Sequence, residues 1–161
     1  MSGVGGAQGV DVADDFPCCA REAPAGPLTI TIPAPNFPPV RDRKTGKLKP
    51  VGPFINSNQR YHRHQEAKMT KAWREAAALR AHGMPQFEGQ VRILAHIWKP
   101  RDTYKFDPNN LADTTKAIVD GLVDAGLFID DSREYVVGPD HRWGGKGPAA
   151  VIITISQEGT E

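Results

Sequence analysis

The stretch from Phe106 to Ser132, FDPNNLADTTKAIVDGLVDAGLFIDDS, has residue types that could do chemistry. It carries six aspartates in 27 residues, although the net charge of the 161-residue chain is only +1. Carboxylates gathered at the two ends of a short helix can hold a divalent cation, because Mg²⁺ and Ca²⁺ prefer hard oxygen ligands. They can also be helix caps or solvent-facing charges, so each position has to be considered separately.

The middle of this stretch predicts a helix from Leu111 to about Asp124. Asn109 or Asn110 can cap its start, and Gly126 can terminate it. At about 100° per residue, polar groups fall on one face and apolar groups on the opposite face. The polar face contains Asp113, Lys116, Asp120 and Asp124, and the apolar face Leu111, Ile118, Leu122 and Ala125. The helix should therefore pack through its apolar face and expose an acidic face with one lysine.

Three further aspartates flank the helix: Asp107 before its start, and Asp130 and Asp131 after its end. Mg²⁺ usually takes one or two carboxylates together with water and substrate phosphates. These aspartates can supply them if the neighbouring strands bring the two helix ends together, and a nearby lysine can neutralise charge on a phosphate. The pattern favours a metal-dependent phosphodiesterase. An EF-hand is excluded, since counting from Asp107 would put Ala112 at its glycine and Ile118 at its last ligand.

Each of these residues also has a purely structural interpretation. Asp113 can satisfy free amides in the first turn of the helix, and Lys116 with Asp120 is an ordinary pair at i, i+4 spacing. The Asp-Asp-Ser sequence after the helix is common in turns. The metal hypothesis therefore depends on the set of residues rather than on any one of them.

Basic residues are concentrated in the part of the chain that precedes the acidic stretch. Between Arg41 and Lys105 there are 15 Lys and Arg against 5 Asp and Glu, whereas the rest of the chain has 5 against 14. This separation suits a protein that holds a polyanion beside a metal, although solvated charges on separate faces are the alternative. The candidate phosphate contacts are Arg60, Arg63, Lys68, Lys71, Arg74, Lys99, Arg101 and Lys105.

The composition, 39% hydrophobic and 24% charged, is typical of a soluble protein with one core. No apolar run approaches the ~20 residues of a membrane span, and no secretory signal is recognisable. Only Cys18 and Cys19 occur, and adjacent cysteines rarely form a disulfide, which favours a reduced, cytoplasmic protein without membrane association. Residues 1–26 predict a disordered tail, and residues 27–158 a single domain.

Periodicity predicts the order strand, helix, strand, helix, strand, strand. The strands are expected at Leu28–Pro33, in QVRILAHIWKP before Pro100, in EYVVG and in AAVIITIS, and the first helix at about Gln65–Ala81, stopped by Gly83. The proline-rich segment Ala34–Phe54 predicts a long basic loop. We therefore expect an α+β fold: a single small domain with a mixed four-stranded sheet and two helices packed mainly on one face.

The acidic stretch also resembles the signature of RusA-type Holliday junction resolvases: an aspartate, then Asn-Leu, a lysine, an aspartate, Ala-Gly and a paired Asp-Asp. The segment NSNQRYHRH, Asn56–His64, resembles the Asn-Arg-Tyr segment of that family, and LTITIP resembles its first strand. The similarity extends from about Leu28 to Ser156.

This resemblance implies a homodimeric, magnesium-dependent endonuclease that resolves four-way DNA junctions in recombination and repair. By position, Asp107 and Asp131 match metal-binding catalytic aspartates, and Lys116 matches the motif lysine. Asp120 matches a family aspartate that has either a structural role or a position close to the metal. Asn109 and Asp130 are additional candidate ligands. The basic residues would then contact DNA phosphates rather than read its sequence.

Two features depart from the family pattern. Asn109 stands where the family commonly has a second aspartate, and the interval from Asn110 to Asp120 is about three residues longer than in short members. Three extra residues are close to one helical turn, so Lys116 would return to nearly the same face of the helix. Two other functions stay open: a junction-binding protein with weak or no catalysis, and a metal-binding protein acting on a small phosphorylated molecule.

Overall fold

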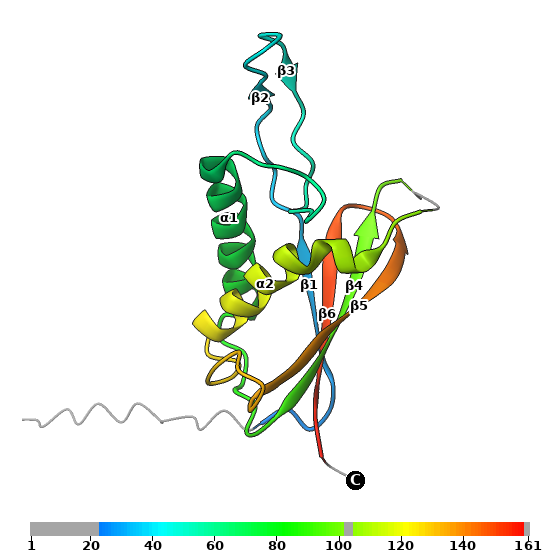
Figure 1. Cartoon of the computed structure of the whole chain (residues 1–161). Coiled ribbons are helices and arrows are strands. Elements are labelled where there is room, and N and C mark those ends of the chain that lie inside the picture. The colour runs from blue at the N-terminus through cyan, green and yellow to red at the C-terminus, as the bar shows by residue number, and fades with distance from the viewer. Residues whose placement is uncertain (1–22, 102–104, 160–161) are drawn as a thin grey trace, which may run out of the picture.

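The computed structural model describes residues 23–101 and 105–159. Its centre is a mixed four-stranded sheet with strand order β1-β6-β4-β5, formed by β1 (Leu28–Pro33), β4 (Val91–Lys99), β5 (Val136–Lys146) and β6 (Ala150–Gln157). Two helices, α1 (Arg63–Ala81) and α2 (Ala112–Asp124), pack together over one face of this sheet (Figure 1). The predicted α+β class, the four-stranded sheet and the position of the helices are confirmed.

The core lies between the sheet and the helices because the strands alternate in burial. In β4, Val91, Ile93, Ala95 and Ile97 are buried, and the residues between them are more exposed. β6 pairs antiparallel with both β1 and β4, while β5 pairs parallel with β4 at the edge of the sheet. The parallel pair is possible because the chain crosses over through α2 between β4 and β5.

α1 begins at Arg63, two residues before the predicted start, and Gly83 follows its end with a positive φ of 80°. Its buried residues are Met69, Trp73, Ala77 and Ala81. α2 has the predicted faces: Ile118 and Leu122 are buried, Asp113, Lys116 and Asp124 are exposed. Gly126, with φ of 80°, follows α2 as expected.

Two segments differ from the sequence-based prediction. EYVVG predicts a short strand at 134–138, whereas β5 runs to Lys146 through Pro139 and two glycines. An edge strand tolerates proline because one side of its backbone has no ladder partner. The apolar run LFI at 127–129, after Gly126, predicts a brief extended segment, whereas the structure has a bend there in which Leu127 and Phe128 are buried.

The predicted basic loop contains a small hairpin of β2 (Val40–Arg41) and β3 (Leu48–Lys49). It projects from the sheet and helices, beyond the first turns of α1 (Figure 1). Its turn is closed by Asp42, whose carboxylate accepts the amides of Lys44 and Thr45 at 2.8 and 3.0 Å and pairs with Lys49. Sequence periodicity did not indicate this hairpin, because each strand has only two residues.

The tail predicted for residues 1–26 lies almost entirely outside the described residues, as do Cys18 and Cys19; residues 23–26 contain no helix or strand. No helix in the described ranges is long and apolar enough to span a membrane.

Candidate functional site

Asp107 marks the point where the chain turns from β4 towards α2. It is the N-cap of a short 3₁₀ helix, Pro108–Leu111, and its carboxylate accepts the Asn109 amide at 2.9 Å. The prediction that Asn109 or Asn110 caps the helix is therefore wrong. A 3₁₀ turn precedes α2 and moves the capping position back to Asp107, while Leu111, which directly precedes α2, makes no side-chain cap.

Lys116 and Asp131 meet although 15 positions separate them in the sequence. The Lys116 ammonium lies 3.4 Å from an Asp131 oxygen and 3.7 Å from an Asp120 oxygen. Asp120 is one turn along α2, whereas Asp131 is in the loop that returns to β5. The structure thus brings together three of the predicted site residues, and the lysine is held between two carboxylates.

Lys116 and Asp131 border a hollow of about 310 Å³ between α2 and β5. Its lining includes Asp113, Thr115, Lys116, Asp131, Pro139 and His141. Asp113 also accepts a hydrogen bond from the Ser57 hydroxyl at 3.2 Å, and the Ser57 amide donates to the Asn110 carbonyl at 2.9 Å. The segment that begins at Asn56 is therefore attached to the start of α2.

His141 is a site residue that the sequence did not indicate. It lies on β5 opposite Ala95 of β4, on the helix-covered face, and its Nε2 is 2.7 Å from the Thr115 hydroxyl oxygen. The same hydroxyl lies 3.0 Å from the Ala112 carbonyl oxygen. If it donates there, it accepts from Nε2 of His141, and Nδ1 is then the acceptor of the neutral imidazole. No motif surrounds His141, and only its place on a strand beside α2 reveals it.

Burial lowers the pKa of His141, and the nearby carboxylates of Asp140 and Asp107 oppose this by favouring the charged ring. Because burial dominates, the imidazole is neutral at pH 7 and can accept a proton.

The remaining candidate ligands are less closely involved. Asn109 is exposed, and no hydrogen bond of its side chain is found among the described residues. Asp130 is exposed and accepts the Asp131 amide at 2.9 Å, which fixes the turn that presents Asp131. Within the described ranges, no three His, Cys, Asp or Glu side chains are placed to share one metal ion.

The candidate phosphate contacts fall into two groups. Arg60, Arg63, Lys68 and Lys71 lie before or within the first half of α1, whereas Lys99, Arg101 and Lys105 surround the end of β4. The second group adjoins Asp107. There the Lys99 ammonium lies 4.0 Å from the centre of the Phe106 ring, and burial lowers the pKa of Lys99. Phe106 also makes an edge contact with Trp143, which is 39% exposed.

Two of the predicted phosphate contacts already have acidic partners. Lys71 lies 3.7 Å from Glu75, one turn along α1, in an exposed pair that water screens. Arg74 forms two hydrogen bonds with Asp124 of α2. Arg74 would have to leave that pair to bind a phosphate, so the structure supports a role for it in joining the helices.

Comparison with models of known protein families found no match, and comparison with curated proteins found none either.

Proposed function

We propose that this protein is a metal-dependent endonuclease that cuts four-way DNA junctions, as its resemblance to RusA-type resolvases implies. The observation that carries this proposal is the convergence of Asp131, Lys116 and His141 on one hollow. They come from a loop, a helix and a strand, and they bring together a carboxylate, a cation and a neutral base. In phosphodiester hydrolysis a carboxylate can hold a metal ion, a cation can offset charge on the phosphate, and a neutral imidazole can accept a proton from water.

The donor atoms present fit Mg²⁺. As the resemblance implies, Asp107 and Asp131 would hold the ion: both side chains are exposed, and Asp131 lines the hollow. Two carboxylates suffice for an ion that keeps several waters and also binds substrate phosphate, so a cluster of three acidic groups is not required. When bound, Mg²⁺ lowers the pKa of a coordinated water and polarises the phosphate.

The other residues have roles that follow from their positions. The Lys116 ammonium, held by Asp120 and Asp131, can contact a non-bridging phosphate oxygen and offset the negative charge that develops during cleavage. His141 can accept a proton from the attacking water through Nδ1, and Thr115 fixes the orientation of its ring. Asp113, tied to Ser57, positions the start of α2.

DNA binding would rest on phosphate contacts. Lys99, Arg101 and Lys105 adjoin Asp107, and Arg60, Arg63 and Lys68 extend the basic surface towards the hairpin. Such contacts give affinity without sequence preference. A four-way junction has two equivalent strands to cut, so we propose that two copies of the chain act together as a homodimer, each cutting one strand.

A protein that binds junctions with weak or no catalysis is the second candidate, and Asn109 favours it. Asn109 is neutral, whereas the family that this chain resembles commonly has an aspartate at this position. In addition, the described residues hold no group of three metal ligands. Fewer carboxylates attract a divalent ion less strongly. DNA binding would survive this loss, because it depends on the basic residues.

Incubation of the purified protein with a synthetic four-way junction, with Mg²⁺ or with EDTA, tests the proposal. We expect paired, symmetric cuts near the crossover only when Mg²⁺ is present. Binding without cleavage at any Mg²⁺ concentration would support the second candidate. Failure to bind the junction at low salt would refute both.

A further inference from the structure

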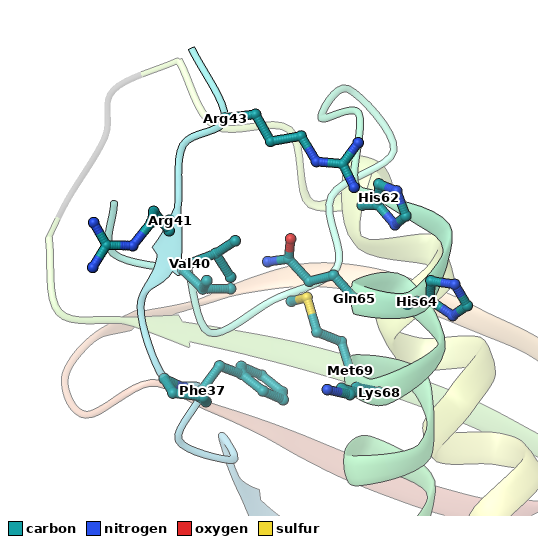
Figure 2. Close-up of a pocket in the computed structure, with 11 residues that line it drawn as sticks. Phe37, Val40, Arg41, Arg43, His62, His64, Gln65, Lys68 and Met69 are labelled. Atoms are coloured by element: carbon teal, nitrogen blue, oxygen red, sulfur yellow. The ribbon is translucent and has the colours of Figure 1, made fainter. Parts of the chain in front are cut away.

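A second cavity lies away from the acidic site, between the base of the hairpin and the first turns of α1. Its volume is about 430 Å³, within the range of about 300–1,000 Å³ that small-ligand sites occupy. Figure 2 shows that Phe37, Val40, Gln65 and Met69 point into it, from β2 and the chain before it on one side and from α1 on the other.

The floor of this cavity is apolar and partly aromatic. Met69 is 1% exposed and belongs to the core, while Phe37 and Val51 are half-buried and pack against that core. The half-buried ring of Phe37 offers a surface on which a flat, unsaturated ring can stack. Gln65 adds an amide that can donate and accept hydrogen bonds.

The rim of the cavity is basic. Arg41, Arg43, His62, His64 and Lys68 line it, and none of its lining residues is acidic. Arg41 donates to the Gly46 carbonyl at 2.6 Å, and in Figure 2 its side chain points away from α1. Arg43 instead reaches across towards His62 (Figure 2), and neither Arg43 nor Lys68 has an acidic partner among the described residues. The nearby Asp42 is engaged by Lys49 and the hairpin turn.

We propose that this cavity binds an unpaired nucleotide of a DNA strand, with the base on Phe37 and the flanking phosphates on Arg43 and Lys68. An apolar floor with a cationic, acid-free rim matches an occupant that has a flat ring and a phosphate on each side. Base stacking on an aromatic side chain, combined with a basic groove, is a general way to hold single strands.

This inference rests on the proposed action on DNA and extends it. Strands change partners at the crossover of a junction, so bases there can leave the stack more easily than in a continuous duplex. A pocket that holds such a base would keep the branch point on the protein while Asp107 and Asp131 act elsewhere. The cavity would thus favour branched over linear DNA.

Binding of the full-length protein to a short oligothymidylate and to an abasic strand of equal length tests the base pocket, in EDTA so that no cleavage occurs. We expect Phe37→Ala to weaken oligothymidylate binding about tenfold or more, with little effect on the abasic strand. Leu48→Ala is the matched control, because Leu48 is an exposed apolar residue of the hairpin outside the cavity. Equal effects of Phe37→Ala on both strands would overturn the proposal.

The phosphate contacts are tested separately with Arg43→Glu and Lys68→Glu, which alter exposed residues and so avoid the folding risk of Phe37→Ala. Removing one contact should reduce the slope of log affinity against log salt by about 0.7 for either strand. Arg80→Glu, at the opposite end of α1, should leave this slope unchanged. If neither Arg43→Glu nor Lys68→Glu alters the slope, the phosphate part of the proposal is overturned.

Failure of this inference can be distinguished from failure of the proposed function. If the wild type cuts junctions but Phe37→Ala and Arg43→Glu bind oligothymidylate normally, only the pocket is refuted. If these variants lose binding as expected and no junction is ever cut, the pocket stands and the nuclease is refuted. A Phe37→Ala protein with normal DNA binding and an altered oligomeric state would show that a second copy occupies the cavity, which also refutes the proposal.

Discussion

Arg74 of α1 and Asp124 at the end of α2 form a bidentate ion pair, with Nε to Oδ2 at 2.5 Å and Nη2 to Oδ1 at 2.8 Å. The pair raises the pKa of Arg74 and lowers that of Asp124. It joins two helices that are 50 positions apart in the sequence, and it therefore helps to fix where α2 holds Lys116 relative to the rest of the site.

Because both side chains of this pair are about half exposed, we expect Arg74→Ala to lower the melting temperature by only a few degrees. Asp124→Asn should do the same, and the double variant should be little worse than either single one, since each removes the same interaction. Thermal unfolding monitored by circular dichroism measures this. Additive losses would show that the two residues act independently.

Gly121 governs the closest approach of α1 and α2. A Cβ at this position would lie 2.2 Å from the Arg74 carbonyl oxygen and 2.9 Å from the Ala77 Cβ. Gly121→Ala should therefore push the helices apart and lower the free energy of unfolding by about 1–3 kcal/mol in urea denaturation. Gly52→Ala, where nothing lies within 4 Å and φ is not positive, is the matched control and should change stability little.

Asp131 and Asp130 are adjacent but have different surroundings, which makes them a matched pair for testing the site. Asp131→Asn should abolish junction cleavage and leave junction binding equal or tighter, because it removes a metal ligand and a negative charge near phosphate. Asp130→Asn should retain most activity, since an amide oxygen can still accept the Asp131 amide. A wild-type cleavage rate for Asp131→Asn would show that the metal site is misplaced.

His141 should make the stability of the protein depend on pH. Burial sets its folded-state pKa below the ordinary value of 6.5, so the unfolded chain takes up a proton first as the pH falls. The contribution of neutral His141 is therefore present above about pH 6.5 and is lost as the pH falls below it. Urea denaturation across this range should give a shallower dependence for His141→Gln, whereas His82→Gln, at the exposed end of α1, should follow the wild type.

The fold was predictable wherever burial imposes a regular pattern. Strand β4 alternates and α2 has one apolar face, because each covers the core on one side only. The continuation of β5 was not predictable, since an edge strand with proline and glycine lacks that alternation. The contact of Lys116 with Asp131 could be anticipated, because both residues belong to one helix and the loop that follows it. The position of His141 could not, because it depends on the pairing of β4 with β5, which local sequence does not encode.

Asn109 provides the last prediction, because the structure removes one of its two interpretations. The cap of the 3₁₀ turn is Asp107, and the Asn109 backbone amide, rather than its side chain, takes part in that cap. The exposed Asn109 side chain is therefore available next to a proposed metal ligand. Asn109→Asp should lower the Mg²⁺ concentration needed for half-maximal cleavage, since each added carboxylate strengthens the attraction for a divalent ion.

The control for this change is Asn110→Asp, which adds the same charge one residue further on, where the backbone carbonyl is held by Ser57. In a Mg²⁺ titration of junction cleavage, we expect the Asn109→Asp curve to move to lower concentration and the Asn110→Asp curve to stay close to the wild type. Equal movement of both curves would indicate a general effect of net charge. Superimposed curves for Asn109→Asp and wild type would mean that this position does not face the metal, and Asp113 or Asp130 would then be the next residue to test.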